Sequence, residues 1–206
     1  MRISRRGFGL IAFGAVAWVS ASHARADAGD PAGVIQNLYG VILDVMKHGP
    51  ELGFQGRYQK LEPAIHQAFD VATMCKIAIG PAWTSMPTDK KNSLLTAFDK
   101  FLVSTYASRF KAFSGQAFQV GASKPATGDR VLVESKLVKS DGEPIELNYL
   151  FRKNESGWQV IDIYLAGSIS QMTQMRSDFS EPLRKGGADG LIQQLDAKIK
   201  QMEGAA

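Results

Sequence analysis

Histidine and cysteine are scarce in this chain of 206 residues, which has three histidines and one cysteine. A single cysteine, Cys75, excludes an intrachain disulfide framework. His48 and His66 lie in no H-E-x-x-H motif and no cysteine–histidine cluster, so no zinc ligand set is visible. A G-x-S-x-G turn, a glycine-rich phosphate loop and a dinucleotide fingerprint are also missing. We therefore expect no catalytic residues, no metal and no cofactor, and interpret the chain as a protein that is not an enzyme.

The chain also lacks a comfortable membrane span, because its apolar stretch from Phe8 to Val19 is shorter than the roughly 20 residues that a bilayer requires. Residues 1–26 combine a basic start, this short apolar stretch and the ending Ala24-Arg25-Ala26, which is the pattern of a secretory signal cleaved after Ala26. Paired arginines followed by Phe8 favour the twin-arginine route. An uncleaved membrane anchor is the alternative. We predict export to the periplasm and a single domain over residues 27–206.

Net charge is missing from the predicted mature chain. The whole sequence has 24 Lys+Arg and 20 Asp+Glu, and residues 1–26 hold four of the arginines and no acid. The remainder therefore carries equal numbers of basic and acidic side chains. Nucleic-acid binding needs a basic footprint, so we expect no nucleic acid as partner.

What the chain has is clear hydrophobic periodicity. Helical spacing predicts a first helix after Asp30-Pro31, a second ending near Phe69 after a glycine-containing segment at 52–58, a third capped by Asp70, and a long helix after Pro87-Thr88. Alternation then predicts about four strands, at 118–123, 129–139, 143–153 and 158–165. Helical spacing returns over 168–184 and, after Gly186-Gly187, over 188–202. The order favours one α+β domain with an antiparallel sheet.

The hairpin around Ser140-Asp141-Gly142 has two possible registers. A two-residue turn places Leu137 opposite Glu146, whereas a three-residue loop with Gly142 in the left-handed conformation places Leu137 opposite Ile145. A one-residue slip flips every side chain, and only the longer loop gathers the apolar residues on one face and sets Lys136 against Glu146. We predict the longer loop, with Ile161, Ile163 and Leu165 of the next strand on the same odd-numbered face.

Three further features have a structural and a functional interpretation. Cys75 lies in an apolar run and is interpreted as a buried small hydrophobe. His48 and His66 are interpreted as surface residues of helices. Asp162, with Tyr164 and Glu134 on the polar side of the sheet, is the best candidate for a general base in a cavity. We favour the alternative that Asp162 accepts backbone hydrogen bonds or pairs with a base such as Arg176.

Several strings, in order and spacing, resemble the MlaC-type periplasmic lipid-binding proteins, also called toluene-tolerance auxiliary proteins. The resemblance covers nearly all of residues 31–200. Its strings are Phe69-Asp70-Val71, Gly80-Pro81-Ala82-Trp83, Phe98-x-x-Phe101-Leu102-Val103-x-x-Tyr106-Ala107, Trp158-Gln159-Val160-Ile161-Asp162-Ile163, Gly167-Ser168-Ile169-Ser170, Arg176-Ser177-x-Phe179 and Gly186-Gly187-x-Asp189-Gly190-Leu191-Ile192.

The resemblance implies an NTF2-like, MlaC-like fold in which a curved sheet, covered by N- and C-terminal helices, encloses an apolar pocket for acyl chains. It also implies a carrier that shuttles phospholipid between an inner-membrane ABC transporter complex and an outer-membrane lipoprotein complex. Such a carrier maintains the asymmetry of the outer membrane. One branch, HpnM, is associated with hopanoids. The chain departs from the common pattern at Asp89-Lys90-Lys91 and at Tyr164-Leu165-Ala166-Gly167-Ser168-Ile169, which leaves the lipid open between phospholipid and hopanoid.

A carrier also has a physical rationale, since a 14-carbon tail costs roughly 11 kcal/mol to expose to water, at about 0.8 kcal/mol per CH₂. We expect a monomer. The alternatives are a periplasmic protein–protein adaptor with a solid core, and a small NTF2-like enzyme using Asp162. The predicted lipid-binding residues are Trp83, Phe98, Leu102, Tyr106, Val133, Leu147, Tyr149, Ile161 and Ile163.

Overall fold

The computed structural model describes residues 30–205. The predicted export signal at 1–26 lies outside the described residues. The elements follow the predicted order of helices, strands and helices. They are α1 (Pro31–Lys47), α2 (Gly49–Ala68), α3 (Val71–Ile79), α4 (Ala82–Ser85), α5 (Thr88–Arg109), β1 (Ala117–Ala126), β2 (Arg130–Val138), β3 (Pro144–Asn154), β4 (Gly157–Leu165), β5 (Ile169–Ser170) and α6 (Gln171–Gly204).

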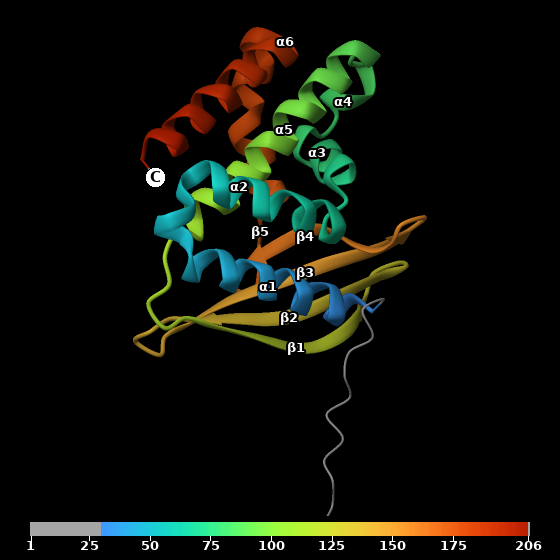
Figure 1. Ribbon diagram of the computed structural model, residues 1–206. Helices are drawn as coiled ribbons and strands as arrows, with labels where there is room; N and C mark the ends of the chain where they lie inside the picture. The colour runs from blue at the N-terminus through green and yellow to red at the C-terminus, as the bar shows by residue number, and fades with distance from the viewer. Residues whose placement is uncertain (1–29, 206) are drawn as a thin grey trace, which may run out of the picture.

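The helix starts carry the predicted caps. The Asp30 carboxylate accepts a hydrogen bond from the backbone N–H of Gly33 at 2.7 Å, and the Asp70 carboxylate accepts one from Thr73 at 2.9 Å. Ser170 caps α6 in the same way, through the backbone N–H of Thr173. The last helix bends at Gly187, where φ is +59°, and its second half returns beside α5 (Figure 1).

The second helix begins earlier than predicted. The segment at 52–58 is helical and is interrupted only at Gly53, where φ is +59°. Arg57, in this segment, is 2 % exposed and donates hydrogen bonds to the backbone oxygens of Gly49 and Ala107 at 2.8 Å each. These bonds join the start of α2 to the end of α5, and they hold a glycine-containing segment in helical conformation that its sequence alone does not favour.

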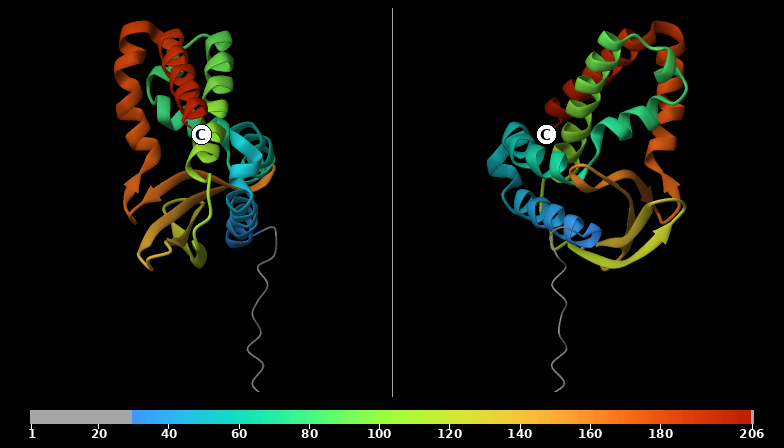
Figure 2. Two further views of the ribbon diagram at one scale, coloured as in Figure 1. Left: turned by 60° about the vertical axis from the view of Figure 1, so that its left-hand side comes forward. Right: turned by 90° about the vertical axis from the view of Figure 1, so that its right-hand side faces the viewer.

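The fold is the predicted α+β type, and the curved antiparallel sheet has strands in the order β1-β2-β3-β4-β5. The fifth strand, two residues long, was not predicted. Pairing of Leu137 with Ile145 and of Lys136 with Glu146 confirms the three-residue hairpin loop, with Gly142 at a φ of +85°. Helix α1 packs on one face of the sheet. Helices α3 to α6 form a second group that lies above the sheet in Figure 1 (Figures 1 and 2).

A β-bulge in β4 changes which residues share a face. Tyr149 pairs with Ile163 and Leu150 with Asp162, but Phe151 pairs with Val160, which leaves Ile161 as the extra residue. At the bulge, the Val160 carbonyl accepts a hydrogen bond from the backbone N–H of Asp70 at 2.9 Å. The bulge thus docks the α2–α3 junction onto the sheet, and the prediction that Ile161 shares the odd-numbered face is wrong.

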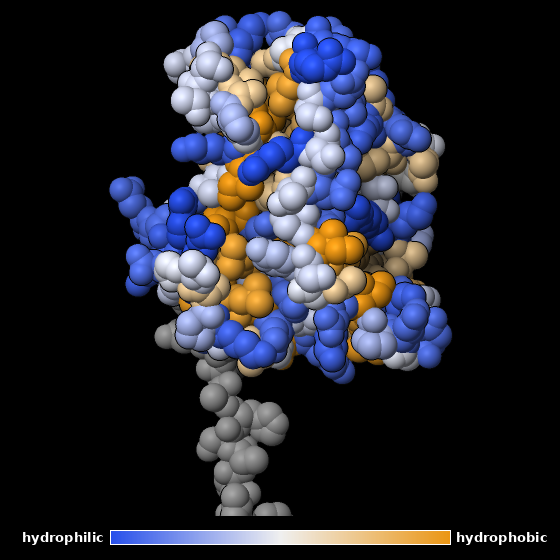
Figure 3. All heavy atoms as spheres, turned by 180° about the vertical axis from the view of Figure 1, so that it is seen from behind, coloured by the Kyte–Doolittle hydropathy of each residue, from blue (hydrophilic) through white to orange (hydrophobic). Residues whose placement is uncertain are grey.

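The core lies between the sheet and the helices and includes fully buried Phe69, Phe98, Phe151 and Phe179. No helix within residues 30–205 is both long and apolar enough to cross a membrane. Seen from behind, hydrophobic residues reach the surface in a broken band between hydrophilic ones, running from the helical layer towards the sheet (Figure 3).

Candidate functional site

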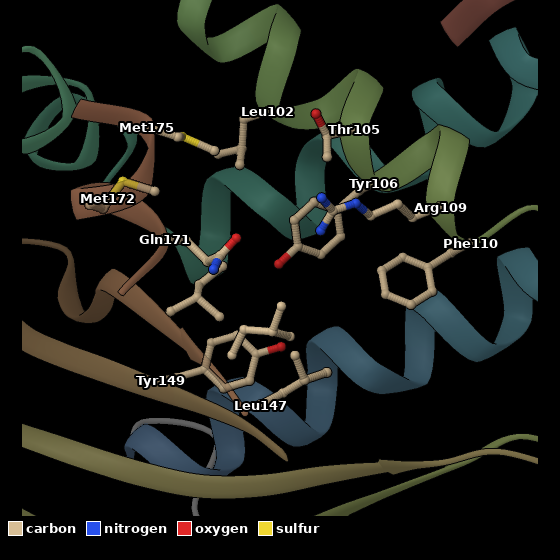
Figure 4. Close-up of a pocket in the computed structure, with 12 residues that line it drawn as sticks. Leu102, Thr105, Tyr106, Arg109, Phe110, Leu147, Tyr149, Gln171, Met172 and Met175 are labelled. Carbon is tan, nitrogen blue, oxygen red and sulfur yellow. The ribbon is translucent and has the colours of Figure 1, made fainter. Parts of the chain in front are cut away.

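An apolar cavity of about 80 Å³ lies between α5, the inner face of β3 and β4, and the start of α6. In Figure 4 the hydroxyls of Tyr106 and Tyr149 point towards one another across it, while Leu102 and Met175 close one side. We call this cavity the inner pocket. Its lining residues are Leu102, Thr105, Tyr106, Arg109, Phe110, Leu147, Tyr149, Ile163, Leu165, Gln171, Met172 and Met175.

The structure brings five of the nine predicted site residues into this lining, and they come from helix α5 and from the two consecutive strands β3 and β4. Helix α5 contributes Leu102 and Tyr106, strand β3 contributes Leu147 and Tyr149, and strand β4 contributes Ile163. Pairing of Tyr149 with Ile163 places the residues of β3 and β4 on one face. The pairing of β3 with β4 therefore assembles the floor of the pocket.

Four predicted residues are not brought to the inner pocket. Phe98 and Val133 are fully buried in the core, where the ring of Phe98 packs edge-on against Phe179 with centroids 6.5 Å apart. Ile161 is turned to the opposite face by the bulge, and Trp83 lies on α4, which faces that same side. Both line a separate cleft on the outer face of the sheet.

The residues at the ends of the pocket are not among the predicted site residues. The lining positions 102, 105, 106 and 109 follow one face of α5, and Phe110 caps its end, so the helical spacing already pointed to Thr105 and Arg109. Met172 and Met175 occupy one face at the start of α6. Their contact with α5 depends on how two distant helices pack, for which the sequence has no local signal.

Buried hydroxyls give the pocket floor its polar groups. The Tyr39 hydroxyl lies 2.5 Å from Ser135 Oγ and donates to the Tyr149 hydroxyl at 3.2 Å, and Ser135 Oγ also donates to the Leu147 carbonyl. Burial raises the pKa of Tyr149 well above its ordinary value and also raises the pKa of Tyr106. These phenols therefore stay neutral at physiological pH, and they offer neither a base nor an anion.

Arg109 is the one charged residue among those lining the inner pocket. It is exposed, and its side chain extends from α5 towards the ring of Tyr106 (Figure 4). The pocket thus combines an apolar interior with a cation near its rim. This arrangement suits an amphiphile that has an apolar part and an anionic group.

The residues considered for catalysis have structural partners. The Asp162 carboxylate accepts hydrogen bonds from the backbone N–H groups of Ile163 and Met172, at 2.8 and 3.1 Å, and from the Ser170 hydroxyl at 2.6 Å. It joins β4 to the start of α6, which confirms the favoured interpretation of backbone hydrogen bonding. It also lies in the outer cleft rather than the inner pocket.

The other candidates follow the structural interpretation as well. Glu134 pairs with Lys124 at 2.5 Å. Cys75 is buried, and burial raises the pKa of its thiol to about 12, so it is a poor nucleophile. His66 is exposed on α2, as predicted, whereas His48 is exposed but lies in the turn between α1 and α2. Within residues 30–205, no group of three or more His, Cys, Asp or Glu is arranged to hold a metal ion.

The fold and the inner pocket define an α+β protein with an apolar cavity between a curved sheet and its helices. Comparison with known families matches residues 36–197 to the MlaC protein family, and the chain belongs to that family. Among solved structures, it is similar to a phospholipid-binding protein from Ralstonia solanacearum, determined in complex with a phospholipid. The TM-score is 0.73 and the identity 25 %, over 84 % of this chain and 98 % of the other.

Proposed function

We propose that this protein is a periplasmic lipid carrier that holds the acyl chains of a phospholipid in the inner pocket, without covalent chemistry. The observation that carries the proposal is the pocket itself, whose lining is apolar except for neutral hydroxyls, one amide and Arg109. Family membership and the similarity to a phospholipid-binding protein support it. Its partners in this proposal are an inner-membrane ABC transporter complex and an outer-membrane lipoprotein complex, between which it shuttles lipid as a monomer.

The pocket must widen to hold an acyl chain, because about 80 Å³ is below the 300–1,000 Å³ of ordinary ligand sites. Two features support such widening. Met172 and Met175 line one side, and methionine side chains adapt readily to irregular spaces. Leu147, Ile163, Leu165 and Phe110 are only half-buried, so they can move apart without opening the fully buried core.

The test is native mass spectrometry of protein purified from the periplasm without detergent, followed by identification of extracted lipid. The wild-type protein should carry one lipid. Leu147→Trp, which fills the pocket, should lose it, whereas Ile145→Trp should keep it. Ile145 is a matched control because it lies two residues along the same strand, is half-buried and does not line the pocket. Wild-type protein that stays lipid-free after incubation with phospholipid vesicles would favour the adaptor without ligand.

Arg109 allows phospholipid to be distinguished from a hopanoid. A guanidinium near the rim pairs with a phosphate group, so Arg109→Gln should weaken retention of a phospholipid about tenfold or more. A sterol-like lipid without a phosphate has no such partner, and its retention should change less than twofold. Extraction and quantification of lipid from the two proteins, each loaded with either lipid, separates the two cases.

A further inference from the structure

A second concave site lies on the outer face of β3 and β4, opposite the inner pocket. This cleft has a volume of about 650 Å³, within the ordinary range for small-ligand sites. Helix α3, the α3–α4 turn and the start of α6 form its walls, and the outer faces of β2, β3 and β4 form its floor. The outer cleft is therefore a preformed hollow rather than a flat surface.

The charge of the outer cleft is strongly positive. Four basic side chains line it, Lys76, Arg130, Arg152 and Arg176, against one carboxylate, that of Asp162. This excess is local, because residues 27–206 carry equal numbers of basic and acidic side chains. The Asp162 carboxylate already accepts three hydrogen bonds from Ile163, Ser170 and Met172.

Two of the arginines face each other across neighbouring strands. Arg130 of β2 pairs directly with Arg152 of β3, and like charges placed directly opposite destabilise a sheet. Arg152 has a carboxylate partner, Asp70 at 3.2 Å. None of the ion pairs within residues 30–205 involves Arg130 or Lys76. The arrangement costs stability in the protein alone, and a bound anion would remove that cost.

Arg176 is held in place at the opposite wall. Its Nε and Nη2 donate hydrogen bonds to the backbone oxygen of Ile77 at 2.9 and 2.7 Å. A carbonyl fixes a guanidinium but does not neutralise its charge. A side chain at Gly80 would come within 3.0 Å of Arg176 Nε, so this glycine leaves the space in which the guanidinium lies. The positive charge at this wall is therefore positioned by the fold.

We infer that the outer cleft binds a phosphate group. Arginine guanidinium groups form paired hydrogen bonds to phosphate oxygens, and the cleft presents three of them around one hollow. Its apolar side chains, Trp83, Leu150 and Ile161, offer contact to the uncharged part of the ligand. The phosphate belongs either to a lipid headgroup or to a small soluble phosphate compound. This inference does not depend on the proposed role of the inner pocket.

The test is calorimetric titration of the purified protein with two probes, inorganic phosphate and dihexanoyl phosphatidylglycerol below its micellar concentration. The Lys76→Gln/Arg130→Gln double variant removes two of the cleft's cations that form no ion pair within residues 30–205, and it leaves Arg176, which hydrogen-bonds the Ile77 carbonyl. Lys153→Gln/Lys200→Gln is the matched control, since it makes the same change in charge at exposed lysines outside the cleft. We expect wild type to bind at least one probe, the double variant to bind at least tenfold more weakly, and the control to stay within twofold of wild type.

Each outcome decides a separate question. Inorganic phosphate that binds at least as tightly as the lipid identifies a soluble phosphate ligand, and tighter binding of the lipid identifies a headgroup. The inference is overturned if neither probe binds to wild type, or if the double variant binds as tightly as wild type. Lipid retained by the double variant through purification, measured by native mass spectrometry, reports on the inner pocket alone, so failure of this inference leaves the proposed carrier function untouched.

Discussion

The two faces of β3 and β4 have opposite properties, although they are built from alternate residues of the same strands. Tyr149 and Ile163 contribute to the inner pocket, which is narrow, apolar and neutral at its floor. Their neighbours Leu150 and Asp162 contribute to the outer cleft, which is about eight times larger and strongly basic. The inner pocket must widen to take a ligand, whereas the outer cleft is already open and is lined by basic side chains. One sheet thus presents two different surfaces, an apolar cavity on one side and a basic cleft on the other.

The largest effect is expected when neighbouring residues on the two faces of the sheet are each replaced by alanine. Phe151 is fully buried beneath the helices, and Arg152 is exposed in the outer cleft. Phe151→Ala should lower the free energy of unfolding by about 3–5 kcal/mol, because it leaves a cavity in the core. Arg152→Ala should lower it by about 1 kcal/mol or less, because the ion pair that it removes joins an exposed arginine to the half-buried Asp70. Urea denaturation of both variants measures the two effects, and equal losses would contradict the division of the sheet into two faces.

The second test uses alkaline pH, to which the inner face should be sensitive. Burial raises the pKa of Tyr39, Tyr106 and Tyr149 in the folded protein. Their stabilising contribution is fully present below the unfolded value of about 10 and is lost as pH rises towards the folded values, at about 1.4 kcal/mol per pH unit for each tyrosine. Urea midpoints measured between pH 9 and 11 should fall steeply, and Tyr106→Phe should flatten the slope. Tyr164→Phe, in the outer cleft, should flatten it less, because that ring is half-buried.

The third test uses acidic pH, to which the rim of the outer cleft should be sensitive. Burial alone would raise the pKa of Asp70, but hydrogen bonds from Thr73, Asn154 and Arg152 outweigh it and hold the pKa below its ordinary value. The stabilisation is therefore present above the unfolded value of about 3.9 and is lost as pH falls below it.

Asp70→Asn keeps a good helix cap but loses the charge. The variant should be about 1 kcal/mol less stable than wild type at pH 7, and the difference should shrink as the pH approaches 3. Chemical denaturation at several pH values measures the stability difference at pH 7 and its decrease towards pH 3. A difference that stayed constant across this range would show that the carboxylate charge contributes nothing.

The sequence predicted more of the inner face than of the outer one, for a physical reason. Alternation was enough to place Leu147, Tyr149 and Ile163 on one face, and the Gly142 turn was enough to set the register of β2 with β3. The bulge at Ile161 could not be predicted, because it depends on the Asp70 N–H bonding the Val160 carbonyl across 90 positions of chain. That one extra residue explains the misplacement of Ile161.

The basic cleft left no pattern in the sequence. Its four cations are scattered over α3, β2, β3 and α6, and the predicted mature chain is neutral overall. Composition and periodicity report on burial, which has a strong local signature. They do not report on charges that only tertiary packing brings together.

The smallest expected effect is the change in the free energy of unfolding when the pair of Arg130 and Arg152 is broken, and the sign of this change is informative. Because Arg130 faces Arg152 across the strands, Arg130→Gln should raise the free energy of unfolding by about 0.2–1 kcal/mol while it weakens phosphate binding. Lys136→Gln on β2 is the matched control, since Lys136 faces Glu146 and its loss should act in the opposite direction. Both effects should fade in high salt, which screens exposed charges. Urea midpoints at low and high salt measure them, and a destabilised Arg130→Gln protein would mean that this arginine serves the fold rather than a ligand.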